Sequence, residues 1–119
     1  MDDLLEEYQR AIVFFEAGDP LGAARILEPV LAAEPGNAGV RLLLARAYFH
    51  SAQLSRAEEH LRVLIERDPT DHYALFVLGR TLERQSRPAE ALPHLRMASV
   101  MHPSDEYEET VRRDAAKVR

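Results

Sequence analysis

The chain has 119 residues, of which 46% are apolar and 29% are charged, and this composition is sufficient for the core of one compact domain. Its formal net charge of −5 and its pI near 5.5 argue against a nucleic-acid-binding protein, because such a protein needs a basic face. It contains no cysteine, which excludes disulfides and thiolate metal sites.

The first residues, Met1-Asp2-Asp3-Leu4-Leu5, are acidic, whereas a secretory signal begins with basic residues. No stretch approaches the roughly 18 apolar residues of a membrane-spanning helix. We therefore expect a cytoplasmic protein that binds neither membranes nor nucleic acid. Lys117 is the one lysine among the 15 basic residues, a bias typical of GC-rich coding, so we expect a bacterial source.

Turn signals divide the chain into seven predicted helices. Gly18-Asp19-Pro20 combines a helix stop, an N-cap and a first-turn proline, and Ser86-Arg87-Pro88 is similar. Pro35, Pro69 and Pro103 end three helices, because proline lacks a backbone N–H and disfavours helix in the residue before it. The predicted helices span residues 3–17, 20–33, 38–51, 54–67, 72–85, 88–101 and 105–118.

A period of 34 residues runs through these helices. It separates the three prolines just named, and it also repeats an alanine, a leucine and a small residue, at Ala23/Ala57/Ala91, Leu27/Leu61/Leu95 and Ala11/Ala45/Gly79. Small side chains let two helices approach closely, whereas larger ones would push their axes apart. The period predicts three stacked helix–turn–helix units, over residues 4–37, 38–71 and 72–105, within a single domain 1–119.

The units resemble the tetratricopeptide repeat (TPR), whose 34-residue pattern is W-x2-L-G-x2-Y, then A-x3-F, then P. The matching segments are Glu7-x2-Arg10-Ala11-x2-Phe14, Ala23-x3-Leu27 and Pro35; Arg41-x2-Leu44-Ala45-x2-Tyr48, Ala57-x3-Leu61 and Pro69; and Leu75-x2-Leu78-Gly79-x2-Leu82, Ala91-x3-Leu95 and Pro103. Glu7 and Arg10 replace expected apolar residues. The resemblance covers about residues 4–105 and implies an all-α fold, a right-handed α-solenoid of antiparallel helix pairs that binds other proteins.

The last predicted helix, 105–118, lacks a partner helix and is expected to cap the third unit, because a terminal unit needs a polar outer face over its own apolar stripe. Acidic residues crowd its start and basic residues its end, which suits the helix dipole. Its apolar stripe is expected to consist of Tyr107, Val111, Ala115 and Val118.

In TPR domains the first helices of successive repeats line a concave groove, so the resemblance implies that equivalent residues of these helices stack beside one another there. Aromatic anchors near arginines are typical of interface hot spots, and a contiguous apolar patch on a soluble chain needs covering. We therefore expect a partner peptide or helix in this groove, against side chains that are surplus to the core. They are Tyr8, Ile12, Phe15, Leu42, Leu43, Arg46, Phe49, His50, Tyr73, Phe76, Val77 and Arg80.

Alternatives stay open for this surface. A second copy of the chain would cover the groove or the capping helix equally well and give a structural homodimer. Individual groove residues would instead complete the packing between neighbouring helices. The groove carries three arginines against Glu16 and Glu83, so a partner segment that is apolar with one or two carboxylates fits best.

The chaperone-tail-binding members of the family carry a carboxylate clamp built from Lys, Asn and Arg. The matching positions in this chain are Tyr8, Ile12, Leu43, Tyr73 and Val77. Only the two tyrosine hydroxyls among them can donate a hydrogen bond, which argues against a chaperone adaptor.

No group of residues predicts catalysis, a cofactor or a metal ion. His60 and His94 are 34 residues apart and would lie about 8–10 Å apart on stacked helices, too far for one ion without a third ligand. They are expected to be solvated surface histidines. The chain has no Gly-rich phosphate loop, no H-E-x-x-H sequence and no nucleophile elbow, so we expect no enzyme activity.

Overall fold

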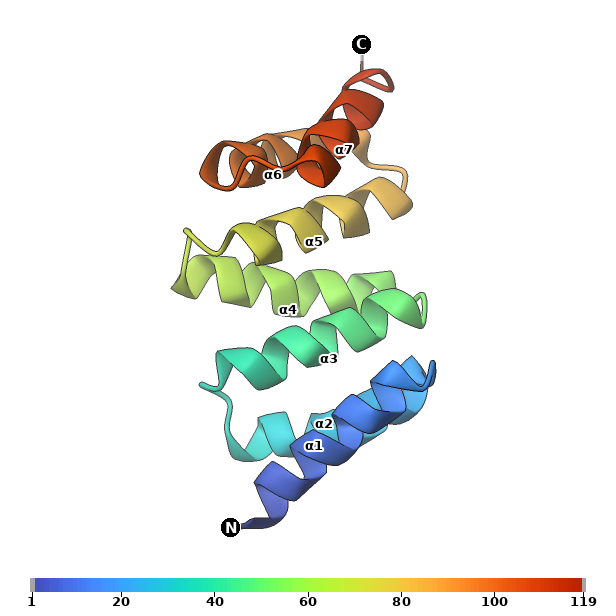
Figure 1. The fold of residues 1–119 in the computed structure, drawn as a ribbon, viewed down its shortest axis with the longest axis vertical. Coiled ribbons are helices and arrows are strands. Elements are labelled where there is room, and N and C mark those ends of the chain that lie inside the picture. The colour runs from blue at the N-terminus through green and yellow to red at the C-terminus, as the bar shows by residue number, and fades with distance from the viewer. Residues whose placement is uncertain (1, 119) are drawn as a thin grey trace. The chain divides into compact units, whose positions relative to one another are not determined.

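The computed structural model describes residues 2–118. Within them the chain forms seven α-helices and no strand (Figure 1), and none of these helices is long and apolar enough to cross a membrane. The helices are α1 (Asp2–Glu16), α2 (Pro20–Ala33), α3 (Ala38–His50), α4 (Leu54–Arg67), α5 (His72–Arg84), α6 (Pro88–Met101) and α7 (Asp105–Ala115). All seven predicted helices are confirmed, and α2, α4 and α6 have the predicted bounds. Helix α7 ends three residues earlier than predicted.

The chain divides into two compact units, Met1–His60 and Leu61–Arg119, and α4 spans the boundary between them. In the first unit α1 packs on α2, and α2 packs on α3. In the second unit α5 packs on α6, and α6 packs on α7. Figure 1 shows these neighbours joined by short turns. The single domain expected for residues 1–119 stays a prediction.

Four helices begin at a side chain that caps their free N–H groups. The capping oxygen accepts a hydrogen bond from the backbone N–H three residues later, at distances of 2.8 Å for Asp19, 3.0 Å for Asn37, 3.0 Å for Asp71 and 3.2 Å for Ser104. The cap predicted at Asp19 is therefore confirmed. Arg87 occupies the cap position before α6 but makes no side-chain cap hydrogen bond, so the third turn has the proline of the first but not its side-chain cap.

The turn between the two helices of each repeat has the same left-handed residue in all three repeats. Gly18, Ala52 and Ser86 lie 34 residues apart and have φ values of 84°, 61° and 60°. The residue after each donates its N–H to the carbonyl oxygen five residues earlier, at 2.8–3.0 Å, which closes the end of the helix. Glycine adopts this conformation freely, whereas an L side chain in it costs of order 1–2 kcal/mol. The sequence therefore marks this turn clearly only in the first repeat.

The residues that repeat every 34 positions form the core. The five alanines of the repeated columns and Leu27, Leu61 and Leu95 have no exposed surface. Gly79 is buried as well, and a Cβ on it would overlap the side chain of Leu95 and lie 3.5 Å from the carbonyl oxygen of Ala91. Helices α5 and α6 thus approach so closely that only a hydrogen atom fits at this position.

The buried face of α7 differs from the predicted stripe. Its buried residues are Tyr107, Thr110 and Asp114, whereas Val111, Ala115 and Val118 are half-buried. Thr110 is accommodated because its hydroxyl donates to the Glu106 carbonyl oxygen at 2.8 Å, which satisfies the hydroxyl within the helix. Only Tyr107 of the predicted stripe is buried, and the buried face also contains the hydroxyl of Thr110 and the carboxyl group of Asp114.

The close contact at Gly79 can be tested by adding a side chain there. We expect Gly79→Leu to lower the free energy of unfolding by about 1–3 kcal/mol or more, because overpacking displaces Leu95 and separates α5 from α6. Ala89→Leu is the matched control, since Ala89 is exposed on α6, and it should change stability by less than about 0.5 kcal/mol. Urea unfolding measures both, and equal stability of the two variants would contradict the close packing.

Candidate partner-binding pocket

Six of the predicted groove residues line one pocket of the first unit, which we call the α1–α3 pocket. Its volume is about 340 Å³. Residues of α1 that lie three or four positions apart share one face of the helix, and this spacing brings Tyr8, Ile12 and Phe15 to the pocket. The complete lining is Tyr8, Ile12, Phe15 and Glu16 from α1, and Gly39, Leu42, Leu43 and Arg46 from α3.

Arg46 is the cation of this pocket, and an aromatic ring orients it. Its guanidinium carbon lies 4.8 Å from the centroid of the Phe15 ring, a cation–π contact worth about 0.5–2 kcal/mol. The His50 ring meets Phe15 edge-on at 5.5 Å and Phe49 edge-on at 5.2 Å. Phe15 and His50 also line a neighbouring hollow of about 320 Å³. The predicted residues Phe15, Arg46, Phe49 and His50 therefore form one continuous cluster.

The exposed fractions of the predicted groove residues in the first unit show which of them form pocket walls and which belong to the core. Tyr8, Ile12, Phe15, Leu42, Arg46 and Phe49 are half-buried, and His50 is exposed. Leu43 lines the pocket but is 7% exposed, so the expectation that it is surplus to the core is wrong. A partner in this pocket would meet partly covered aromatic and aliphatic surfaces with a guanidinium among them.

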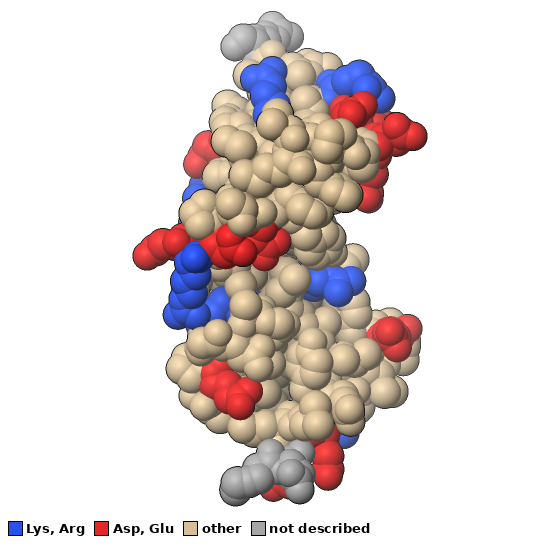
Figure 2. Space-filling view, turned by 60° about the vertical axis from the view of Figure 1, so that its left-hand side comes forward, with Lys and Arg blue, Asp and Glu red and all other residues tan. Residues whose placement is uncertain are grey.

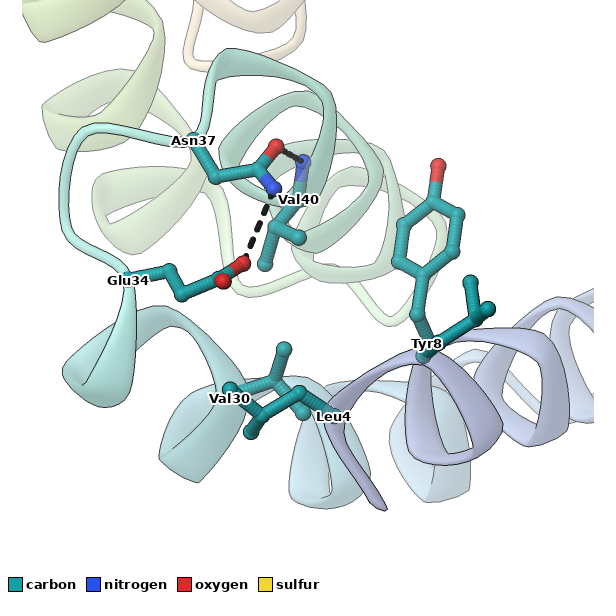
Figure 3. Close-up of a pocket in the computed structure, with 7 residues that line it drawn as sticks. Leu4, Tyr8, Val30, Glu34, Asn37 and Val40 are labelled. Atoms are coloured by element: carbon teal, nitrogen blue, oxygen red, sulfur yellow. Dashed lines mark hydrogen bonds between the residues drawn. The ribbon is translucent and has the colours of Figure 1, made fainter. Parts of the chain in front are cut away.

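A second pocket, which the sequence did not reveal, lies beside Leu4 (Figure 3). It has a volume of about 430 Å³ and is lined by Leu4, Leu5, Tyr8, Val30, Glu34, Asn37 and Val40. Asn37 donates to Glu34 at 3.1 Å and accepts from the backbone N–H of Val40 at 3.0 Å. The cap of α3 thus fixes the polar wall of this pocket. Tyr8 belongs to both pockets, so they adjoin each other along α1.

In the second unit the structure overturns two of the predicted groove residues. Phe76 and Val77 are only 5% and 7% exposed, so neither is surplus to the core, whereas Tyr73 is 36% exposed. The Phe76 ring stacks on the Tyr107 ring of α7, with centroids 4.3 Å apart and planes 15° apart. Arg80 is half-buried, and its Nε donates to Glu83 at 3.1 Å. The face of α5 that would hold a partner is covered at Phe76 by the capping helix.

His60 is part of a polar cluster in the first unit, so its predicted solvation is wrong. Its Nδ1 lies 2.9 Å from the Arg41 guanidinium, and its ring stacks on Tyr48 at 5.8 Å. Burial and the charge of Arg41 lower the pKa of His60, which favours a neutral ring that accepts from Arg41. Burial and a hydrogen bond to Glu28 raise the pKa of Tyr48 to about 12. His94 is also half-buried, and burial and Arg62 lower its pKa.

A pair of stacked histidines occurs in the second unit. The His72 and His102 rings are parallel within 9° with centroids 4.2 Å apart, and His72 Nδ1 lies 3.0 Å from the Tyr107 hydroxyl. Because the two rings are stacked, their nitrogen lone pairs point side by side and do not converge on one point, as the ligands of a metal ion would. Within residues 2–118 no three His, Cys, Asp or Glu side chains gather as metal ligands would.

Charged side chains are sparse on the face in Figure 2, where they stand in small groups among uncharged ones. The α1–α3 pocket contains one acid, Glu16, and one base, Arg46. The lining of this pocket is therefore mainly apolar, with one charged residue of each sign.

Comparison with known sequences assigns the family. Two models described as tetratricopeptide repeat match residues 14–76 and 51–106. The first match covers more than half of the chain, and together the two matches include the second and third predicted repeats completely and the first in part. The chain belongs to the tetratricopeptide repeat family. No curated protein has a significantly similar sequence.

Solved structures have the same fold at low sequence identity. The TPR domain of Arabidopsis OM64 aligns with a TM-score of 0.91 and 17% identity, over 99% of this chain and 98% of that one. The Yersinia enterocolitica type III secretion chaperone SycD, in complex with a peptide of the translocator YopD, has a TM-score of 0.81 and 18% identity, over 98% and 89%. The second TPR domain of human RPAP3, in complex with the HSP70 peptide SGPTIEEVD, has a TM-score of 0.85 and 20% identity, over 93% of each chain.

The burial of Phe76 predicts different effects for two neighbouring aromatic residues. Phe76→Ala should lower the free energy of unfolding by about 3–5 kcal/mol, since it removes a buried ring and its stacking contact with Tyr107. Tyr73→Ala serves as the matched control and should cost less than about 1 kcal/mol, because Tyr73 lies at the surface. Thermal unfolding monitored by circular dichroism compares the two. A small change in the free energy of unfolding for Phe76→Ala would mean that the Phe76 side chain is exposed, as the sequence predicted.

Proposed function

We propose that this TPR domain is a protein-interaction scaffold and that its α1–α3 pocket binds a segment of another protein. The observation that carries this proposal is the cluster of half-buried apolar side chains around Phe15 and Arg46, which leaves apolar surface open to solvent in a pocket of about 340 Å³. Covering such surface is favourable by about 25 cal/mol per Å² of apolar area.

The partner segment is apolar and carries a carboxylate. Tyr8, Ile12, Phe15 and Leu42 supply the apolar walls, and Arg46 supplies a guanidinium that the Phe15 ring holds in a fixed orientation. A guanidinium fixed in this way loses little conformational entropy when it binds a carboxylate. In the second unit, Tyr73 remains a proposed partner contact because it is exposed. Arg80 also remains a proposed partner contact, although it forms an ion pair with Glu83.

Two of the related structures support a peptide as the ligand class. SycD was solved with a peptide of YopD, and the RPAP3 domain with a peptide that ends in two glutamates, valine and aspartate. The clamp positions of this chain hold Tyr8, Ile12, Leu43, Tyr73 and Val77. A chaperone tail that depends on lysine and asparagine donors is therefore not the proposed ligand. The proposal assigns the chain no catalytic role and a cytoplasmic location.

The proposal is tested with peptides selected from a display library. Selected peptides should be rich in apolar residues with at least one acid. The double variant Phe15→Ala, Leu42→Ala should weaken their binding by about 2–4 kcal/mol, or roughly 30- to 1,000-fold in Kd. Arg46→Gln should weaken acidic peptides more than their amide analogues. Fluorescence anisotropy measures each Kd.

Val13→Ala is the matched control for this test, because Val13 is on α1 but 63% exposed and outside the α1–α3 pocket. It should leave the Kd unchanged. If no peptide is selected and light scattering shows a dimer that Phe15→Ala, Leu42→Ala converts to a monomer, the pocket is a contact between two copies of the chain and the proposed function is wrong.

A further inference from the structure

A buried carboxyl group in the capping helix has no role in the proposed pocket. Asp114 has no exposed surface, and neither of its carboxyl oxygens has a hydrogen-bond partner within the described residues. An ionised carboxylate buried in this way loses its hydration without compensation, which costs several kcal/mol. A buried aspartate on a helix that is otherwise strongly charged therefore requires a physical explanation.

The nearby cations bind the neighbouring carboxylate and not Asp114. Arg113 donates to both oxygens of Glu83 at 3.0 and 3.1 Å, Arg80 donates at 3.1 Å, and the Lys117 ammonium lies 3.7 Å away. The Glu83 side chain is only 8% exposed. Burial raises the pKa of Glu83, but the Arg113 hydrogen bond and the charges of Arg113, Arg80 and Lys117 outweigh it, and the net pKa is lowered. Glu83 is the ionised member of the pair.

Asp114 has the opposite environment. Burial and the adjacent Glu83 carboxylate raise its pKa, and the charges of Lys117 and Arg113 offset only part of that rise. Two neighbouring carboxyl groups in a buried site favour a state in which one proton is held between them. A protonated Asp114 can donate its O–H to Glu83, which supplies the hydrogen bond that the ionised form lacks.

We propose that Asp114 carries a proton that it donates to Glu83, and that this shared proton latches α7 onto α5, so that α7 is released when the proton is lost. The proton passes to solvent and leaves two carboxylates in a buried site. Since the Tyr107 ring of α7 covers Phe76, release exposes an aromatic side chain of α5. This latch lies entirely in the second unit and is independent of the pocket proposed for partner binding.

The other charged groups near the latch do not replace the proton. On α7, Glu109 acts on Arg113. On α6, which packs against α7, the titratable and charged residues are Glu90, His94 and Arg96; Glu90 pairs with Arg87 at 2.7 Å, His94 lies by Arg62, and Arg96 is exposed. A metal ion in place of the proton would be repelled by the three cations that surround Glu83.

The latch gives opposite pH dependences to its two members. The folded-state pKa of Asp114 is raised, so its contribution to stability is present below the unfolded-state pKa of about 3.8 and is lost as the pH rises through the folded-state pKa. The folded-state pKa of Glu83 is lowered, so its contribution is present above about 4.5 and is lost as the pH falls through the folded-state pKa. The packing of α7 on α5 therefore weakens at high pH, where Asp114 loses its proton, and at low pH, where Glu83 gains one.

The test follows the Asp114 carboxyl carbon and the Phe76–Tyr107 ring contacts by NMR across a pH titration of the whole chain. Asp114 should titrate above the ordinary aspartate range, and the ring contacts should fade with the same midpoint. In Asp114→Asn, which keeps the size and an N–H donor but cannot ionise, the contacts should persist at alkaline pH. In Glu83→Gln, whose amide donates to an ionised carboxylate, the Asp114 midpoint should move down by at least one pH unit.

Glu108→Gln is the control, because Glu108 is an exposed acid on the same helix, and it should leave the Asp114 midpoint unchanged. The proposal is overturned if Asp114 titrates at or below the ordinary value. It is also overturned if the ring contacts survive ionisation of Asp114, or if Asp114→Asn loses them at the wild-type midpoint.

Discussion

The structure depends on the close approach of paired helices, which small side chains permit. Gly79 makes this constraint most severe, because any Cβ there would overlap Leu95 of the facing helix. Alanines without exposed surface occupy the other repeated positions, and fully buried leucines surround them. Since this contact uses one side of each helix, the adjoining sides of α1 and α3 remain available to line the α1–α3 pocket.

The period and the turn residues predicted most of the fold, because both depend on local chemistry. Helix bounds followed from prolines and caps, and the core followed from columns that recur every 34 residues. The burial of Phe76 did not follow, since the period states which residues are equivalent but not which of them the final helix covers. In the first two repeats the equivalent residues Tyr8 and Leu42 are half-buried, whereas Phe76 meets Tyr107. Burial in the last repeat therefore differs from burial at the equivalent positions of the earlier repeats, because the capping helix covers it.

Polar groups in the interior were the other features that the sequence did not reveal. Asp114 is not part of the apolar stripe that the sequence predicted for its helix, and a carboxylate is normally exposed. Its raised pKa depends in part on Glu83, which lies 31 positions earlier in the chain, and the nearby cations bind Glu83 instead. His60 is similar, since its partner Arg41 comes from another helix. Contacts between distant polar residues carry no periodic signal, whereas apolar contacts at helical spacing do.

The most direct test of the proposed binding pocket is an NMR map of backbone amide shifts upon addition of a selected peptide. The account predicts that the largest shifts occur at Ile12, Phe15, Leu42 and Arg46, with saturation at the Kd measured by anisotropy. The outer face of α6 is the informative comparison, because Met97, Val100 and Met101 are 49%, 77% and 39% exposed there. Largest shifts on α6, with α1 and α3 unaffected, would contradict the assignment of the partner to the α1–α3 pocket.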